Sequence, residues 1–189
     1  MRSIQVSVFS LLLCLLFVNC GTSPAAAQRK ATWAQPVESK YVENFYKVDN
    51  GIYRSGQPSS EAFKEMEQMG MKEVLNLRNY HSDKDEAEGT NLKLNRVAMS
   101  ASNSDWDELV EAVRIIKNRK GPIVIHCWHG SDRTGLVVAL YRLVFQNWTK
   151  EDALDELEHG GYGYHTIYGN IKTFIRNVNV EEFKKDVMK

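Results

Sequence analysis

The segment from Ile123 to Gly135 most constrains how this chain folds. It opens with the β-branched run Ile123-Val124-Ile125, which is typical of a strand buried on both faces. A glycine-containing loop over 128–132 follows, and Arg133-Thr134-Gly135 begins a helix that continues to Phe145 and is apolar on nearly all sides. Such a helix belongs at the centre of a domain. The segment therefore predicts a buried strand, a tight loop and a central helix in immediate succession.

The rest of the chain alternates between the strand and helix periods. We expect further strands at 52–54, 74–77 and 92–97. Helices are expected after Ser59 or Ser60 with Phe63, Met66 and Met69 buried, from about Asp105, after Thr149, and from about Tyr168. Alternating elements with no internal repeat predict a single α/β domain.

Composition excludes some classes of function. The chain has 189 residues, 43% apolar and 25% charged, which is ordinary for a soluble globular protein. Its 24 Lys and Arg residues balance 24 Asp and Glu residues. We therefore expect no nucleic-acid partner, because general nucleic-acid binders carry a basic excess.

Residues 1–27 have the parts of a secretory signal peptide. Arg2 precedes the apolar run Val6–Val18, and Ala25-Ala26-Ala27 offers a cleavage site. The alternative is a lipid anchor on Cys20, whose preceding residues fit a lipoprotein box poorly. We expect a mobile lead-in over 28–45 and the folded domain over 46–189.

Cleavage after Ala27 would leave Cys127 as the one cysteine of the exported protein. A lone thiol in an oxidising compartment is a liability unless it is buried or needed for chemistry. The predicted strand carries His126 and Cys127 to its carboxyl end, where loop amides and a helix N-terminus converge on an anion. The helix dipole and Arg133 both favour the thiolate, and the planar guanidinium would hold two phosphoryl oxygens above it.

This C-x5-R-[S/T] pattern resembles the signature of cysteine-dependent phosphatases. Tyr53–Ser59 (YRSGQPS), Asn76–Arg78 (NLR) and His159–His165 (HGGYGYH) also resemble the dual-specificity-type tyrosine phosphatases exported by bacteria. Fungal and plant atypical dual-specificity phosphatases are related, and some of these act on inositol pyrophosphates. The resemblance covers about 46–177. It implies a protein tyrosine phosphatase-like fold, with a central, mostly parallel sheet flanked by helices, and catalysis without a metal or cofactor.

The resemblance also implies a role for each residue of the motif. Cys127 would be the nucleophile and form a cysteinyl-phosphate, while Arg133 would bind the phosphate and stabilise the transition state. Thr134 would hydrogen-bond the thiolate, and His126 would orient Cys127 from behind. The loop backbone would bind the phosphoryl oxygens, through Trp128, His129, Gly130, Ser131, Asp132 and Arg133.

The identity of the general acid is left open by the sequence. Members of this family use an Asp on a loop upstream of the nucleophile, just ahead of a helix. We expect Asp105 to be this residue, because it lies nearer to the loop than Asp107 does. The alternative for Asp105 is a structural helix cap. Asp107, read as a residue in the first turn of a helix capped by Ser104, and Asp132, beside Arg133, are the other candidates.

Three further features of the sequence have a simple structural interpretation beside a functional one. Arg78 would bind an anionic substrate or form a surface salt bridge. The acidic loop 83–88 is most simply a solvated surface. A metal site built from His126, Cys127 and His129 is not expected, because strand–loop geometry scatters these ligands.

The sequence thus predicts an exported phosphatase, in the bacterial periplasm or anchored there as a lipoprotein. Its expected substrate is protein phosphotyrosine. The alternatives are an inositol polyphosphate or other small phosphate, and a pseudophosphatase that binds phosphate without turnover.

Overall fold

The computed structural model describes residues 29–103 and 105–189, so the predictions for residues 1–27 and Ser104 lie outside the described residues. The strands are β1 (Gln35–Pro36), β2 (Tyr46–Asp49), β3 (Ile52–Ser55), β4 (Glu73–Arg78), β5 (Lys93–Met99) and β6 (Ile123–His126). The helices are α1 (Ser60–Gln68), α2 (Trp106–Asn118), α3 (Asp132–Phe145), α4 (Lys150–His159), α5 (Gly169–Asn177) and α6 (Val180–Met188).

The strands form one mixed sheet in the order β1-β2-β3-β6-β4-β5. Pairing is parallel from β3 through β6 and β4 to β5, and β1 and β2 extend the sheet with antiparallel pairing. The carboxyl ends of β4, β5 and β6 therefore meet at one edge of the sheet. The predicted α/β fold, with a mostly parallel sheet flanked by helices, is confirmed.

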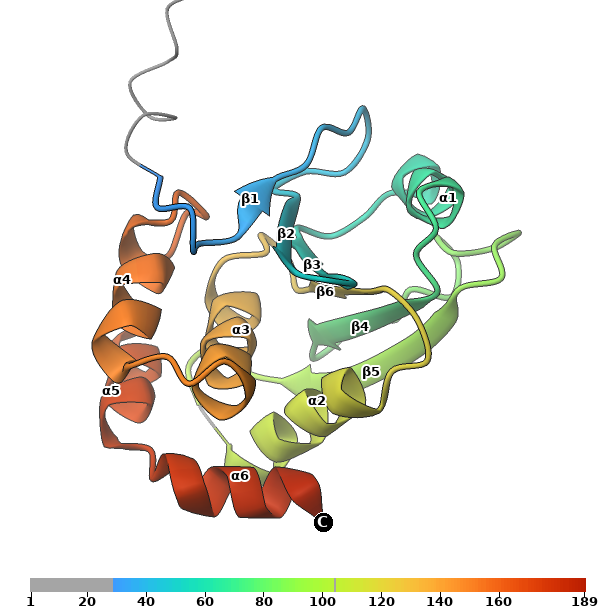
Figure 1. Cartoon of the computed structure of the whole chain (residues 1–189). Helices are drawn as coiled ribbons and strands as arrows, with labels where there is room; N and C mark the ends of the chain where they lie inside the picture. Colours follow the sequence, from blue (N-terminus) through green and yellow to red (C-terminus); the bar gives the residue numbers. More distant parts are fainter. Residues whose placement is uncertain (1–28, 104) are drawn as a thin grey trace, which may run out of the picture.

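Helices cover both faces of the sheet (Figure 1). Ile123 and Ile125 of β6 point into the larger core, which they share with α2 and α3. Val124, between them, points into a smaller core with Phe63 and Met66 of α1. The β-branched run is thus buried on both faces as predicted, because successive side chains of a strand alternate between its faces.

The N-cap residues predicted from the sequence mark the observed starts of two helices. Ser59 caps α1 and Thr149 caps α4, each accepting a hydrogen bond from a backbone N–H of the first turn. Met69 was expected on the buried face of α1 but is 41% exposed, because the helix ends at Gln68 and Met69 is its C-cap. Met71, just past the turn, is buried in the smaller core instead.

The expected mobile lead-in over 28–45 is wrong for its described part. Trp33 and Ala34 are buried, and β1 pairs with β2. The backbone N–H of Ala34 donates to Oε1 of Glu156 at 2.6 Å, which ties this segment to α4. The packed domain therefore includes residues from 29 onward.

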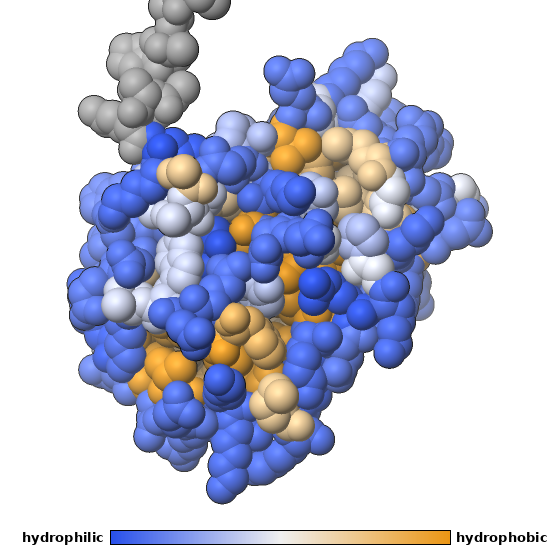
Figure 2. Space-filling model, in the orientation of Figure 1, coloured by the Kyte–Doolittle hydropathy of each residue, from blue (hydrophilic) through white to orange (hydrophobic). Residues whose placement is uncertain are grey.

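Hydrophilic side chains dominate the face seen in Figure 2, with smaller apolar areas between them. Within the described ranges, no helix combines the length and the apolar character that crossing a bilayer requires.

Candidate active site

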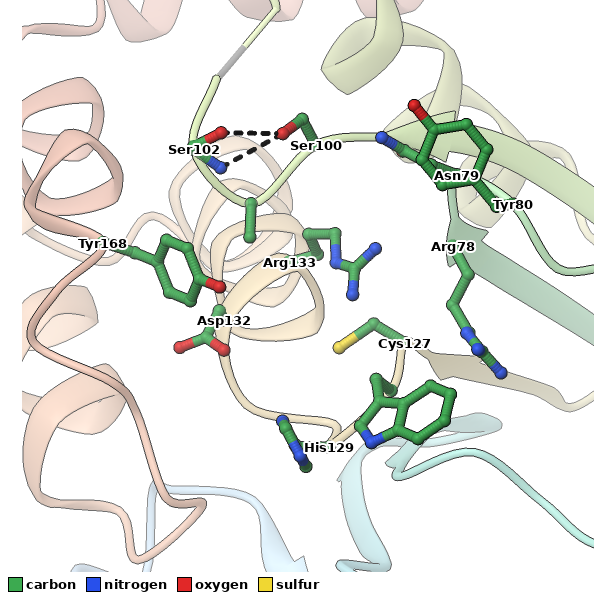
Figure 3. A pocket seen from close by; sticks show the side chains of 12 residues that line it. Arg78, Asn79, Tyr80, Ser100, Ser102, Cys127, His129, Asp132, Arg133 and Tyr168 are labelled. Carbon is green, nitrogen blue, oxygen red and sulfur yellow. Dashed lines mark hydrogen bonds between the residues drawn. The ribbon is translucent and has the colours of Figure 1, made fainter.

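A cavity of about 410 Å³ opens at the edge of the sheet where β4, β5 and β6 end (Figure 3). Residues after all three strands line it, together with the start of α3 and one residue ahead of α5. The lining residues are Arg78, Asn79, Tyr80, Ser100, Ala101, Ser102, Cys127, Trp128, His129, Asp132, Arg133 and Tyr168. Open α/β sheets bind ligands at this edge.

Cys127 lies at the base of the cavity, directly after β6. It is a free cysteine and only 2% exposed. Arg133 reaches the same hollow from the first turn of α3, and Figure 3 shows its guanidinium pointing toward Cys127. One guanidinium nitrogen donates long hydrogen bonds, 3.4 Å each, to the carbonyls of Leu77 and Met99. The structure thus brings together the thiol and the guanidinium that the sequence paired.

Arg54 of β3 holds the loop between Cys127 and Arg133 in place. Its Nη2 donates to the carbonyl of Gly130 at 2.7 Å, and its guanidinium lies 3.7 Å from the ring centre of Tyr162. Arg54 is 1% exposed, and this burial lowers the pKa of its guanidinium. Gly130 has a φ of 74°, and a Cβ there would collide with the backbone of Ser55. A side chain at Gly130 would therefore displace the loop from β3.

His126 is fully buried between the backbone of Cys127 and the side chain of Asp83. Its Nδ1 lies 3.2 Å from the carbonyl of Cys127, and its Nε2 lies 2.9 Å from Oδ2 of Asp83. A carbonyl and an ionised carboxylate only accept hydrogen bonds. An N–H on each ring nitrogen would satisfy both acceptors, and a ring with both hydrogens carries a positive charge next to Cys127.

Asp83 is a functional residue that sequence reasoning missed, because the loop 83–88 was expected to be solvated. Asp83 is 4% exposed and Ala87 6%. Burial acts to raise the pKa of Asp83, but the hydrogen bond and the charge of His126 outweigh it and hold that pKa below its ordinary 3.8. The alternation of β6 was an available signal, since it places His126 on the same face as Val124, toward this loop.

Asp83 continues outward into a chain of polar contacts that ends at the cavity wall. Gln57 donates to Asp83 at 3.1 Å and accepts from Arg78 at 2.8 Å. The Arg78 guanidinium lies 4.1 Å from a ring centre of Trp128. Arg78 has no ion pair within the described ranges, so its expected alternative role in a surface salt bridge is not found. Burial, and then the charge of Arg133, lower the pKa of Arg78.

The three candidate acids lie in different places. Asp105 is exposed, lies outside the cavity lining, and is the N-cap of α2, accepting from the backbone N–H groups of Asp107 and Glu108 at 3.0 and 3.1 Å. The N-cap of α2 is thus Asp105, while the expectation that Ser104 is the cap falls on a residue outside the described ones. Asp107 is exposed in the first turn of α2.

Asp132 is the one carboxylate that lines the cavity among the described residues. It is 5% exposed. Its Oδ1 accepts from the backbone N–H of His165 at 2.9 Å, and its Oδ2 lies 2.9 Å from Nδ1 of the same residue. The structure therefore does not bring Asp105 to the thiol but does bring Asp132.

Comparison with known proteins agrees with this geometry. A model of the tyrosine phosphatase family matches residues 41–189. This chain belongs to the tyrosine phosphatase family. The match begins within the packed N-terminal segment and includes every residue that lines the cavity.

Relatives of this phosphatase include TpbA, a dual specificity protein phosphatase of Pseudomonas aeruginosa. TpbA is 31% identical over 160 residues, which are 82% of this chain and 71% of TpbA. The crystal structure of TpbA matches with a TM-score of 0.76 at 27% identity, over 84% of this chain and 98% of that one. A cysteine-to-serine variant of TpbA in complex with phosphotyrosine matches with the same TM-score, over 85% of this chain and 99% of the other.

A second group of relatives consists of a PP-IP phosphatase and inositol diphosphatases. The catalytic domain of Siw14 from S. cerevisiae, a PP-IP phosphatase, matches with a TM-score of 0.68 at 29% identity, over 78% of this chain and 93% of that one. An inositol diphosphatase of Oryza sativa is 30% identical over 125 residues, 61% of each chain. The protein is thus a cysteine-dependent phosphatase of the tyrosine and dual-specificity type.

Proposed function

We propose that this phosphatase is exported and that it hydrolyses phosphotyrosine in proteins. The observation that carries the proposal is the aromatic wall of the cavity above a deeply placed thiol. Tyr80 is fully exposed, Trp128 is 56% exposed, and both line the cavity with Tyr168, while Cys127 at the base is 2% exposed. A phosphotyrosine side chain matches this arrangement, because its ring would pack on aromatic walls while its phosphate reaches the base. The TpbA complex with phosphotyrosine supports the same substrate.

The first chemical step transfers the phosphoryl group to Cys127. The thiolate attacks phosphorus, the S–P bond forms, and the P–O bond to the tyrosyl oxygen breaks. Arg133 and the loop amides hold the other phosphoryl oxygens as their charge grows. The hydroxyl of Thr134 is buried without a hydrogen-bond partner among the described residues, which leaves it available to the thiolate that leaves in the second step.

Proton transfer falls to Asp132 in this arrangement, since Asp105 lies outside the cavity. Protonated Asp132 donates its proton to the leaving tyrosyl oxygen, then accepts a proton from the water that attacks the cysteinyl-phosphate. Inorganic phosphate and the thiolate are released, and Asp132 is again protonated. His165 fixes the orientation of the carboxyl group by holding both of its oxygens.

Release of phosphate from a phosphotyrosyl peptide, with EDTA present, tests the proposed function. The unaltered protein should turn over, and Cys127→Ser should lose roughly 10⁴-fold or more in kcat, because it lacks the nucleophile. Phosphopeptide binding without turnover in the unaltered protein would instead support the pseudophosphatase alternative.

A second candidate substrate is an inositol polyphosphate. Arg78 favours it, because this second cation lines the cavity with no carboxylate partner among the described residues. The inositol diphosphatase relatives favour it as well. The two substrates separate by comparing kcat/KM for the phosphopeptide and for inositol phosphates in the unaltered protein and in Arg78→Gln. A larger loss on the inositol phosphate, together with a higher starting value, would favour the second candidate.

Export is the remaining part of the proposal and depends on residues 1–27. We propose cleavage after Ala27 and release into the bacterial periplasm. Mass spectrometry of the mature protein from a periplasmic fraction tests this. A first residue of Gln28 supports cleavage, whereas a diacylglyceryl group on Cys20 would show a lipid-anchored protein.

A further inference from the structure

Two imidazoles and one buried carboxylate meet at the wall of the active-site cavity. They belong to His129 in the phosphate loop, Asp132 at the start of α3, and His165 in the loop between α4 and α5. One potential ligand atom from each residue lies within 4.8 Å of the other two. The rings of His129 and His165 are 5.1 Å apart, centre to centre.

We infer that these three residues form a binding site for a divalent transition-metal cation of the zinc class, and that the cation inhibits the enzyme. Zinc takes imidazole and carboxylate ligands in tetrahedral geometry at about 2.0–2.2 Å, so neighbouring ligand atoms lie roughly 3.3 Å apart. Nδ1 of His165 and Oδ2 of Asp132 are already 2.9 Å apart. A ligand atom of His129 lies within 4.8 Å of the other two, so small movements of the three side chains would complete the set.

The surroundings of the three ligands suit a cation. Asp132 is 5% exposed, and its second oxygen is fixed by the backbone N–H of His165, an outer contact of the kind that orients metal ligands. The ring of His129 is exposed and makes no hydrogen bond within the described ranges, which leaves it free to turn. On binding, the cation takes the place of the hydrogen bond between Nδ1 of His165 and Oδ2 of Asp132 and forms bonds to that nitrogen and that oxygen. A proton displaced from either atom passes to the other ring nitrogen of His165 or to solvent.

Inhibition follows from where the cation would lie, and this part rests on the proposed function. His129 and Asp132 line the cavity that holds Cys127. A cation on Asp132 would prevent the carboxyl group from donating its proton to the leaving oxygen. Three protein ligands also leave a fourth coordination position open beside the substrate path.

Zinc titration by calorimetry tests binding without relying on catalysis. The Cys127→Ser protein is the starting point, because its thiolate would bind zinc by itself. One equivalent should bind, and adding His165→Gln or His129→Gln should weaken the affinity at least about tenfold. Co²⁺ should give the visible absorption of a tetrahedral site with these nitrogen and oxygen ligands. Circular dichroism would confirm that each variant is folded.

The matched control is His81→Gln. His81, Asp83 and Glu86 form the other cluster of potential ligands in the described ranges, but His81 already pairs with Glu86 at 2.9 Å and Asp83 with His126. His81→Gln should leave zinc binding unchanged. Loss of binding in His81→Gln, or unchanged affinity in both His165→Gln and His129→Gln, would overturn the inference.

Turnover of a phosphotyrosyl peptide tests the inhibition separately. Zinc should inhibit the unaltered protein, EDTA should reverse the effect, and Mg²⁺ or Ca²⁺ should have none. His165→Gln should lower turnover, because Asp132 loses the side chain that orients it. The turnover that remains should need at least about tenfold more zinc for half inhibition. Equal inhibition of His165→Gln would overturn the inhibitory role, while a protein that binds zinc but never turns over would instead contradict the proposed function.

Discussion

The Nε2 atom of His126 lies 2.9 Å from Oδ2 of Asp83, and neither side chain is more than 4% exposed. The pair connects the nucleophile to a loop 43 residues upstream in sequence. The other ring nitrogen faces the carbonyl of Cys127, so the carboxylate of Asp83 favours the form of His126 that has a hydrogen on both nitrogens and a positive charge. Charge of this sign favours a thiolate at the base of the cavity.

Asp83→Asn should therefore slow the enzyme without touching the substrate. The uncharged amide no longer stabilises a charged His126, so less thiolate forms and kcat/KM falls, by roughly tenfold if about 1.4 kcal/mol of transition-state stabilisation is lost. Alkylation of Cys127 by iodoacetamide at pH 6 should slow in parallel. Asp85→Asn is the control, because Asp85 is exposed in the same loop. Normal alkylation in Asp83→Asn would show a purely structural pair.

The same pair predicts how stability depends on pH. The pKa of Asp83 is lowered in the folded protein, since the hydrogen bond and charge of His126 outweigh the effect of burial. A carboxylate with a lowered pKa stabilises the fold fully above its unfolded pKa, about 3.9, and loses this contribution as pH falls through the folded value. The difference in free energy of unfolding between the unaltered protein and Asp83→Asn should thus be full around pH 5, where an unfolded Asp is ionised and an unfolded His is still protonated, and should shrink below about pH 4. Denaturant titrations across this range measure it, and a difference that grows in acid would contradict the assignment.

What the sequence predicted best was local. The β-branched run before Cys127, the spacing to Arg133, and the caps Ser59 and Thr149 each depend on neighbours within a few residues. Backbone periodicity and capping chemistry decide such features. The structure therefore reproduces the strand, the loop and the central helix where the sequence placed them.

What the sequence missed depends on contacts between distant segments. Asp83 and Arg54 have their roles only because the sheet brings β3 and the loop after β4 against β6, and their own neighbours give no sign of burial. Asp105, which we expected to be the general acid, lies outside the cavity lining for a related reason. A carboxylate just ahead of a helix also serves as an N-cap, and in this structure the cap is what Asp105 provides.

The proton donor can be identified by pairing Asp132→Asn with Asp105→Asn. Asp132→Asn should lower kcat for a phosphotyrosyl peptide by about 10²-fold or more. The loss should be smaller for nitrophenyl phosphate. Nitrophenolate is a good leaving group and needs no proton, whereas the tyrosyl oxygen does need one. Asp105→Asn should change neither rate, since asparagine caps a helix as well as aspartate. The opposite pattern would show that the loop carrying Asp105 closes on the bound substrate.

Glu156 of α4 should be among the most sensitive positions for stability. Its carboxylate accepts two hydrogen bonds of 2.9 Å from Arg142 of α3, and further ones from Tyr162 and from the backbone of Ala34. Arg142 and Glu156 are 3% and 2% exposed, so a charge left alone there is not solvated. Glu156→Gln should cost about 3 kcal/mol, because breaking a buried pair strands its partner.

Thermal unfolding measures the effect of Glu156→Gln, with an expected fall in Tm of roughly 6–12 °C for a domain of this size. Glu158→Gln on the same helix is the matched control. Glu158 pairs with Lys172 across a partly exposed contact, where an ion pair contributes at most about 1 kcal/mol. Equal melting temperatures in the two variants would mean that the N-terminal segment and α3 hold together without this carboxylate, through Trp33, Tyr162 and the apolar side chains around them.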